Sequence, residues 1–211
     1  MTFSIIARDP ESGAFGIAVS TAVPCVGAMV PHVQPGIGAI ATQSYTNVRL
    51  AIDGLPLLER GMSPEEALTS LLAKDGGAAT RQCAGIDARG RIFAYSGSEC
   101  VDWYGSRTGE NYSVQGNMLV GKGTIDAMAE AFEASMGHLA SRLLKALEAG
   151  QAAGGDKRGR ESAALLVAPF LEDDGKIDIR VDLHDDPVAE LRRIFDAMRE
   201  RYREMIGQEG L

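Results

Sequence analysis

The stretch Thr2-Phe3-Ser4-Ile5-Ile6-Ala7-Arg8-Asp9 opens the chain after its first methionine, and it decides the fold. From Phe3 to Arg8 nearly every residue is apolar, which is typical of a strand covered on both faces. Residues 9–13 form a turn, and Phe15 to Val23 is a second strand. The sequence therefore predicts an N-terminal hairpin whose first strand is central and buried.

Thr2 at the start of this strand could provide a nucleophile and a general base for catalysis. If the mature chain begins at Thr2, one residue holds both a free amine and a β-hydroxyl. An unperturbed α-amino group has a pKa near ~7.7–8.0, close to working pH, so it can take the proton from the hydroxyl and activate it as a nucleophile. The alternative is an ordinary strand threonine with the methionine retained, which would block this chemistry.

The length and charge of the chain limit its possible partners. At 211 residues the chain can bury a substantial core, and we expect a single domain over residues 1–211. The formal net charge is −8 and the pI is about 4.9, whereas nucleic acids and anionic membrane surfaces attract basic proteins. No segment approaches the ~20 apolar residues of a membrane span. The composition thus argues against nucleic-acid and membrane partners.

The cysteines and the start of the chain favour a cytoplasmic location. Nothing resembles a secretory signal, because Arg8, Asp9 and Pro10 interrupt the first apolar stretch. The chain has three cysteines, which are Cys25, Cys83 and Cys100. Their odd number and wide spacing fit neither a disulfide framework nor a zinc site, so we expect a reducing cytoplasm.

The remaining pattern groups strands and helices separately. Further strands are expected over residues 26–33, 36–42, 82–87, 91–96, 103–105, 112–116, 163–169 and 177–183. Helices are expected over residues 47–60, from a Ser63–Glu66 capping box to about residue 74, from residue 123, over 138–149 and from residue 187. This grouping argues against a doubly wound fold. It predicts an α+β fold, a four-layer αββα sandwich of two antiparallel sheets flanked by helices.

Four segments carry a resemblance to a known family. They are residues 1–10, 41–47, 115–117 and 154–165, which read MTFSIIARDP, ATQSYTN, QGN and GGDKRGRESAAL. These segments resemble the family called domain of unknown function 1028, which is grouped with the Ntn (N-terminal nucleophile) hydrolases. The resemblance spans essentially the whole chain. It implies an Ntn-hydrolase-like fold with Thr2 as the candidate nucleophile, and it implies no known substrate.

The segment 41–47 lies where a strand is expected to end and a helix to begin. Helix N-termini present free N–H groups and a partial positive charge, and the resemblance implies oxyanion donors at a junction of this kind. Gln43 and Asn47 add amide donors that could hold an oxyanion, with Ser44 beside them in the substrate pocket. Alternatively, Ser44 or Asn47 caps the helix. Arg49 could reach the same pocket or pair with a surface acid.

A glycine-flanked loop in this acidic protein holds three cations next to Asp156. Arg158 and Arg160 could clamp a substrate carboxylate, with Asp156 orienting an arginine or the terminal amine. An exposed charged loop is the alternative. Of this loop, the resemblance favours Asp156 and Arg160.

Polar residues of neighbouring strands complete the candidate substrate pocket. Gln115 and Asn117 end one strand, although a simple turn would also explain them. Ser20 and Thr21 lie beside Thr2 if the hairpin pairs as expected, and they could hydrogen-bond the terminal amine.

The sequence provides no motif for a metal or an organic cofactor. The three histidines, His32, His138 and His184, are far apart and outside any metal-binding motif. The glycine-rich stretches lack a phosphate-binding loop. We therefore expect no metal and no cofactor.

These features favour an amidohydrolase that cleaves a small amide bearing a carboxylate. Thr2 would be the nucleophile, with Gln43, Asn47 and Asp156 as further catalytic residues. The alternative is a non-catalytic small-molecule binding or assembly protein that retains the fold. Apolar stripes on the helices from residues 123 and 187 suggest a homo-oligomer, unless they belong to the core.

We predict that the mature protein in its own cell begins at Thr2, because threonine at position 2 is small and bulky second residues are what normally protect a first methionine. N-terminal sequencing of protein isolated from its native host tests this. A retained Met1 would exclude Thr2 as an N-terminal nucleophile.

Overall fold

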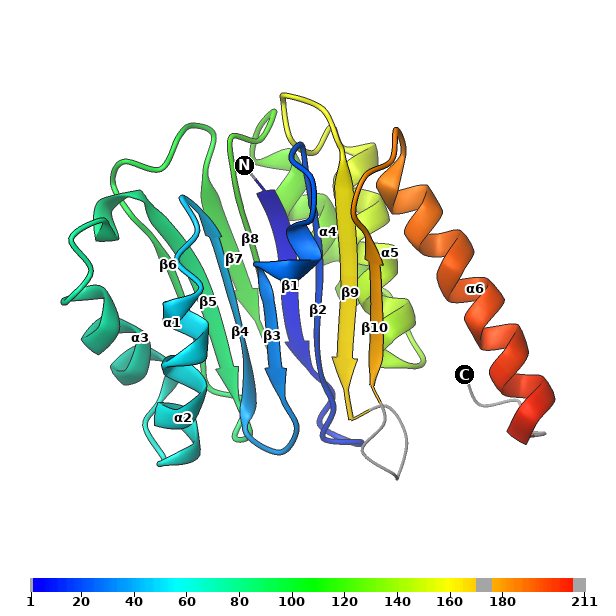
Figure 1. Cartoon of the computed structure of the whole chain (residues 1–211), viewed down its shortest axis with the longest axis horizontal. Helices are drawn as coiled ribbons and strands as arrows, with labels where there is room; N and C mark the ends of the chain where they lie inside the picture. Colours follow the sequence, from blue (N-terminus) through cyan, green and yellow to red (C-terminus); the bar gives the residue numbers. More distant parts are fainter. Residues whose placement is uncertain (1, 170–175, 207–211) are drawn as a thin grey trace.

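Two antiparallel sheets form the centre of the computed structural model, which describes residues 2–169 and 176–206. Within these residues the larger sheet has the strand order β10-β9-β2-β1-β8-β7 and the smaller has the order β3-β4-β5-β6 (Figure 1). The larger sheet contains β1 (Thr2–Arg8), β2 (Phe15–Thr21), β7 (Gly105–Gly109), β8 (Tyr112–Asn117), β9 (Ser162–Ala168) and β10 (Ile177–Val181). The smaller contains β3 (Pro31–Gln34), β4 (Gly38–Ser44), β5 (Arg81–Asp87) and β6 (Ile92–Ser96).

The predicted central position of β1 is confirmed. It pairs with β2 on one side and β8 on the other, and its residues from Thr2 to Ala7 are buried. Phe3 and Ile5 pack in the cluster formed with the helices, whereas Ile6 packs in the cluster between the sheets. Because side chains alternate along a strand, Thr2 and Ser4 share the inner face with Ile6.

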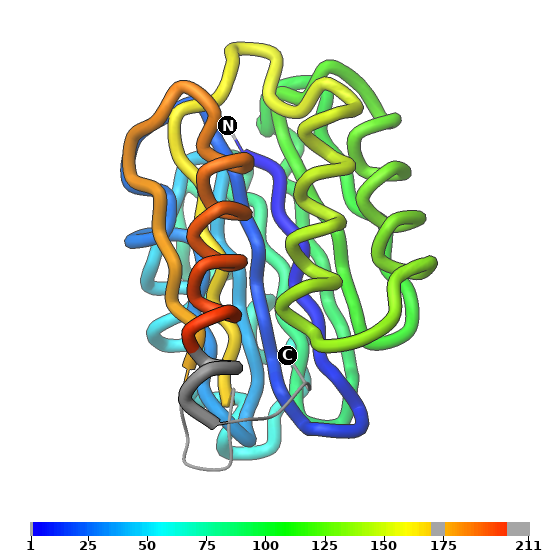
Figure 2. The backbone as a smooth tube through the Cα atoms, turned by 90° about the vertical axis from the view of Figure 1, so that its right-hand side faces the viewer, coloured from blue at the N-terminus to red at the C-terminus, as the bar shows by residue number. Residues whose placement is uncertain are grey.

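Helices cover the outer faces of both sheets and give four layers. On the larger sheet lie α4 (Gly123–Glu133), α5 (Leu139–Ala152) and α6 (Pro187–Ile206). Figure 2 shows α4 and α5 side by side in green, with α6 in orange to red nearer the viewer. On the smaller sheet lie α1 (Arg49–Ile52), α2 (Gly54–Glu59) and α3 (Pro64–Leu72). Two short 3₁₀ turns, η1 (Val26–Ala28) and η2 (Ala78–Thr80), complete the described elements.

The apolar helix stripes belong to the chain's own core. Met128 and Phe132 of α4 are at most 2% exposed, and so are Leu191 and Phe195 of α6. These residues therefore give no support for a homo-oligomer. Met136, expected on the same stripe as Met128, lies beyond the end of α4 and is 85% exposed. The side chains of residues 202 and 205, expected on the α6 stripe, lie outside the described residues.

Two expected elements near the start of the chain are shorter than predicted. The strand expected over 26–33 is replaced at its start by η1, where the N–H groups of Ala28 and Met29 donate to the carbonyls of Cys25 and Val26, and β3 begins only at Pro31. The helix expected over 47–60 is divided into α1 and α2. Pro56 explains this break, since proline has no N–H to donate to the carbonyl of Ile52.

Two later boundaries also differ from the prediction. Trp103 lies outside β7, because its carbonyl accepts a hydrogen bond from the N–H of Leu119 (3.0 Å) and not from a ladder partner. The α5 helix extends beyond residue 149 to Ala152. It ends where Gly154 and Gly155 adopt positive φ values of 111° and 57°.

No helix in the part of the chain that the structure describes combines the length and apolar character needed to cross a membrane.

We predict that Ser63→Ala lowers the free energy of unfolding by about 1 kcal/mol. The Ser63 hydroxyl accepts from the N–H of Glu66 (3.1 Å), and the Glu66 carboxylate accepts from the N–H of Ser63 (2.7 Å), which is the capping box expected from the sequence. Urea unfolding measures the change. Ser70→Ala in the same helix is the control, and an equal loss there would contradict the capping role.

Candidate active site at the start of β1

The space between the sheets is apolar along most of its length and becomes polar where β1 starts. The apolar part contains Ile6, Phe15, Ile17, Val19, Val26, Val30, Ala39, Ala41, Ala84, Ile86 and Ala164. At the polar end lie Thr2, Ser4, Thr21, Gln43, Gln82, Gln115 and Asn117, and each of them is at most 5% exposed. Burying a polar group costs free energy unless it is hydrogen-bonded, so this end of the layer requires a dense network of partners.

Thr2 lies in the middle of a polar row that crosses four strands. Its direct strand partners are Thr21 and Asn117, and Thr21 is paired in turn with Ser162. The Thr2 hydroxyl donates to the Thr21 hydroxyl oxygen at 3.3 Å. The Thr2 carbonyl accepts from the Gln43 side-chain amide at 3.4 Å. The structure therefore brings Thr2, Thr21, Gln43 and Asn117 together as the sequence predicted.

A chain of neutral hydrogen bonds connects the two sheets beneath Thr2. The Ser113 hydroxyl donates to Gln115 Oε1 (2.9 Å), and Gln115 Nε2 donates to Ser4 Oγ (2.6 Å). The Ser4 hydroxyl donates to Gln43 Oε1 (2.7 Å), and Gln43 Nε2 donates to Gln82 Oε1 (2.8 Å). In each of these hydrogen bonds the donor is the residue nearer to Ser113 in the hydrogen-bond chain and the acceptor is the residue nearer to Gln82. Each hydroxyl and amide therefore has a defined orientation.

Sequence reasoning did not single out Ser4 and Gln82. Each is a polar residue at an inward-facing position of a strand whose next inward residues, Ile6 and Ala84, belong to the apolar cluster. A polar residue at such a position is unusual, and this interruption of the alternation was the available signal.

The loop after α5 closes over this end of the larger sheet. Asp156 is 3% exposed, and its Oδ2 accepts from the N–H of Ala22, just beyond β2 (3.2 Å). The N–H of Lys157 donates to the Met118 carbonyl (3.1 Å), just beyond β8. Because β2 and β8 flank β1, the loop is fixed to both neighbours of Thr2 (Figure 1).

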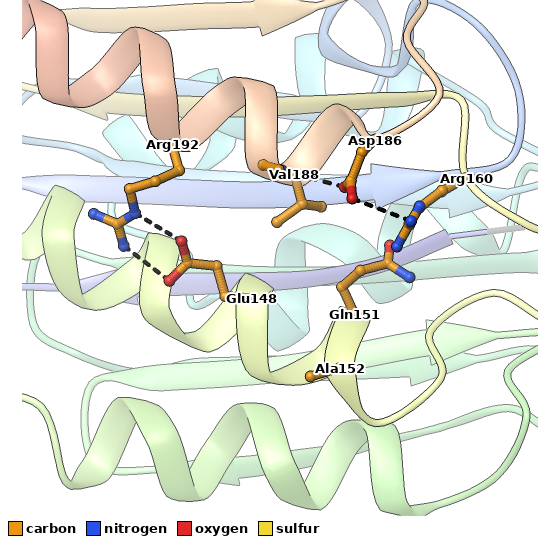
Figure 3. A pocket seen from close by; sticks show the side chains of 8 residues that line it. Glu148, Gln151, Ala152, Arg160, Asp186, Val188 and Arg192 are labelled. Carbon is orange, nitrogen blue, oxygen red and sulfur yellow. Dashed lines mark hydrogen bonds and ion pairs between the residues drawn. The ribbon is translucent and has the colours of Figure 1, made fainter.

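The two arginines of this loop have different surroundings. Arg158 pairs with Asp156 through its Nη2 (3.0 Å) and is 38% exposed, so Asp156 does orient an arginine. Arg160 pairs with Asp186 (3.1 Å) and borders a pocket of about 380 Å³ between α5 and α6. In Figure 3 its guanidinium points toward Gln151 and Asp186. Arg160 thus lies with the outer helices, whereas Thr2 faces the opposite side of the sheet.

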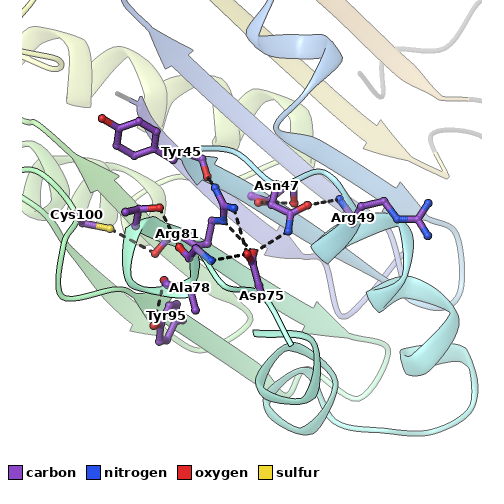
Figure 4. A network of polar contacts seen from close by, with 11 residues as sticks. Tyr45, Asn47, Arg49, Asp75, Ala78, Arg81, Tyr95 and Cys100 are labelled. Carbon is purple, nitrogen blue, oxygen red and sulfur yellow. Dashed lines mark hydrogen bonds and ion pairs between the residues drawn. The ribbon is translucent and has the colours of Figure 1, made fainter. Parts of the chain in front are cut away.

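A second network fixes the turn that follows Gln43 (Figure 4). The Asn47 amide donates to Asp75 Oδ2 (2.7 Å), and Arg81 binds the same carboxylate through its Nε (2.9 Å). Arg81 also donates to the carbonyl of Tyr45 (2.6 Å). The side-chain donor of Asn47 is therefore used within the protein. Hydrogen bonds from Arg81 and then Asn47 hold the pKa of Asp75 well below its usual range.

Three further residues were predicted to belong to the site, and these are Arg49, Ser20 and Ser44. Arg49 is on the surface, where it pairs with Asp53 (2.8 Å). The Ser20 hydroxyl donates to the Ser162 carbonyl (3.2 Å), and alternation places Ser20 on the opposite face from Thr21. Ser44 ends β4 with a left-handed φ of 70°, directly after Gln43.

The described part of the chain contains no cluster of metal ligands, and two of its three thiols are buried. Within residues 2–169 and 176–206, no group of three or more histidine, cysteine or acidic side chains could hold a metal ion. Burial raises the pKa of the Cys83 thiol to about 12 and also raises that of Cys100. Both thiols are therefore protonated at neutral pH.

Comparison with known proteins identifies the family. Residues 2–191 match the model of a family of unknown function, DUF1028, and the chain belongs to this family, as its sequence segments predicted. A crystal structure from Silicibacter pomeroyi, assigned to the same family, is 37% identical with a TM-score of 0.87, covering 93% of this chain and 85% of that one. No curated protein matches the chain.

A second solved structure is more distant. Anbu (ancestral beta-subunit) from Yersinia bercovieri is 13% identical with a TM-score of 0.39, covering 98% of this chain and 97% of that one. A likeness at this level supports no conclusion about fold or function.

We predict that Asp75→Asn lowers the free energy of unfolding by about 1–3 kcal/mol at pH 7, because it removes the charge from partly buried hydrogen bonds with Arg81 and Asn47. The pKa of Asp75 is lower in the folded state, so its contribution is complete above the ordinary carboxyl pKa of about 3.9 and is lost as pH falls through the folded value. The difference between wild type and variant should therefore stay constant from pH 7 to about pH 5 and shrink as pH falls below about 4. Urea unfolding at several pH values measures it.

Asp53→Asn is the matched control, because Asp53 pairs with Arg49 on the surface, where an ion pair contributes little. A difference between wild type and Asp75→Asn that stays constant with pH would contradict the proposed ionisation.

Proposed function

We propose that this protein is an Ntn-hydrolase-like amidohydrolase with Thr2 as an N-terminal nucleophile, acting on a small amide that bears a carboxylate. The observation that carries the proposal is the position of Thr2. It is the first residue of an interior strand, its hydroxyl is hydrogen-bonded to Thr21, and it stands at the polar end of the inter-sheet layer. A nucleophile held there has a fixed backbone and a surrounding of oriented dipoles.

The reaction requires the chain to begin at Thr2. The Thr2 hydroxyl oxygen attacks the amide carbonyl carbon while the terminal amine takes the hydroxyl proton. The C–N bond then breaks, the proton passes to the leaving amine, and an acyl ester remains on Thr2. Water, activated by the same amine, cleaves this ester to release the carboxylic acid and restore the hydroxyl.

The surrounding residues have separate roles in this proposal. Gln43 holds the Thr2 carbonyl and so fixes the backbone of the nucleophile. Main-chain N–H groups of the turn between Gln43 and Asn47 stabilise the oxyanion, and the Asp75–Arg81 network holds this turn. Asp156 anchors the loop that carries Lys157 and Arg158 to the same end of the sheet. These cations are the candidates for binding a substrate carboxylate.

The alternative is a non-catalytic small-molecule binding or assembly protein. The observation in its favour is that the Thr2 hydroxyl and the amide of Gln43 are already engaged in internal hydrogen bonds. A purely structural polar cluster would have this property as well. The two hypotheses differ in whether Thr2 forms a covalent intermediate.

We predict that protein beginning at Thr2 hydrolyses a small carboxylated amide and that Thr2→Ala lowers the rate by several orders of magnitude. Thr2→Ser should keep partial activity, because it supplies the same hydroxyl. The melting temperature of Thr2→Ala should change only slightly, since a small terminal side chain is lost. The assay is a panel of amides and N-acyl amino acids, run on protein shown by mass to lack Met1.

Equal turnover by wild type and Thr2→Ala would remove Thr2 from the mechanism. Absence of turnover for the whole panel would favour the binding or assembly protein.

A further inference from the structure

Gln82 of the smaller sheet is hydrogen-bonded to Asn117, which lies directly opposite Thr2 in the larger sheet. Gln82 lies on β5, is 0% exposed, and reaches across the inter-sheet space. Its Oε1 accepts from Gln43 Nε2 (2.8 Å) and from Asn117 Nδ2 (2.9 Å). Its Nε2 donates to the Gly116 carbonyl (2.8 Å) and to Ser96 Oγ (2.8 Å). One side chain therefore connects both sheets around Thr2.

The orientation of Gln82 is determined by the chemistry of its partners. The main-chain carbonyl of Gly116 can only accept a hydrogen bond, so the Gln82 group facing it must be the amide nitrogen. Gln82 Oε1 then faces Asn117, and because an oxygen can only accept, Asn117 must present its Nδ2. The Oδ1 of Asn117 is consequently the part of this carboxamide that is turned away from Gln82.

Asn117 is directly opposite Thr2 in the larger sheet. Residues opposite one another on antiparallel strands point to the same face, with their Cβ atoms about 4.5–5.5 Å apart. The Asn117 carboxamide is therefore within reach of the Thr2 amine and hydroxyl.

We propose that Gln82 is a positioning residue for Thr2 that acts through Asn117, by holding the Asn117 Oδ1 as the hydrogen-bond acceptor for the terminal amine. This inference rests on the proposed function. An N–H of the amine donates to Oδ1, so the amine cannot rotate freely and its lone pair is directed to the Thr2 hydroxyl proton. Gln82 itself touches neither the amine nor the substrate.

The test uses p-nitrophenyl acetate as the probe, because this reactive ester reports on the nucleophile without a known substrate. The Thr2 oxygen attacks the ester carbonyl, its proton passes to the amine, and p-nitrophenolate leaves. Absorbance follows the p-nitrophenolate. Mass spectrometry of a digest locates the acetyl group on Thr2, and hydroxylamine distinguishes an ester, which it removes, from an acetylated amine.

Four variants, all processed to begin at Thr2, are compared with wild type. Gln82→Met retains the length of the side chain but loses the orienting donor and acceptor, and Asn117→Leu removes the acceptor. Each should slow acetylation by about 10- to 100-fold, the effect expected when a reacting group is misplaced by about 1 Å. The double variant should be no slower than Asn117→Leu alone, because Gln82 acts through Asn117. Ser135→Ala is the control and should stay within about two-fold of wild type, because Ser135 lies just beyond α4, donates to the Ala131 carbonyl and does not belong to this network.

Melting temperatures show whether each variant is folded. If Gln82→Met does not fold, Gln82→Glu replaces it, since it keeps the shape and an acceptor oxygen but loses the amide donor; its rate should lie between wild type and Asn117→Leu.

The outcomes separate the two proposals. Effects of Gln82→Met and Asn117→Leu that multiply in the double variant would overturn the positioning role while leaving Thr2 as a nucleophile. Equal rates for Gln82→Met and Ser135→Ala would do the same. A wild-type protein that is not acetylated on Thr2 would overturn the proposed function, and the positioning role with it.

Discussion

The need to satisfy buried polar groups between two sheets is the constraint on which the arrangement around Thr2 depends. Stacked sheets lie about 10 Å apart, and an unpaired polar group there costs about 1–3 kcal/mol. Glutamine is long enough to reach a partner on the facing sheet, and Gln43 and Gln82 do so, whereas Gln115 donates to Ser4 within its own sheet. The same hydrogen bonds avoid this cost and also fix the position of β4 and β5 over β1 and β8 of the facing sheet.

The network beneath Thr2 differs chemically from the one around Asp75. Ser4, Gln43, Gln82 and Gln115 have no ionisable group in the physiological range, so their geometry is independent of pH. The turn after Gln43 depends instead on the charge of Asp75, whose low pKa keeps it ionised down to acid pH. A terminal amine at Thr2, which the proposed function requires, would therefore change its protonation state without disturbing these neutral supports.

The layers, the central β1 and the α3 capping box could be predicted because they follow from local signals: continuous apolar runs, turn residues and cap spacing. The break between α1 and α2 at Asp53 was not predicted, although Pro56, which has no N–H to donate to the Ile52 carbonyl, was the available signal. The orientation of Arg160 could not be predicted, because no local pattern indicates that its partner is Asp186, 26 positions later. Gln82 illustrates a similar limit. The interrupted apolar alternation marks Gln82 as unusual, but its importance comes from Gly116 and Asn117 on the facing sheet, and a single sequence does not identify such distant partners.

The topology also restricts how a molecule could reach Thr2. Strands β2 and β8 cover β1 on both sides, the helices cover the outer face, and the apolar cluster fills the inner layer below Ser4. Among the residues that the structure describes, only the end of the sheet remains, where Thr2 is 5% exposed beneath the loop anchored at Ala22 and Met118. Under the proposed function, a substrate would therefore approach along the strand axis and meet this loop before it meets Thr2. Residues of the loop, including Lys157 and Arg158, would then be in a position to select substrates by charge, whereas the buried amides would orient Thr2.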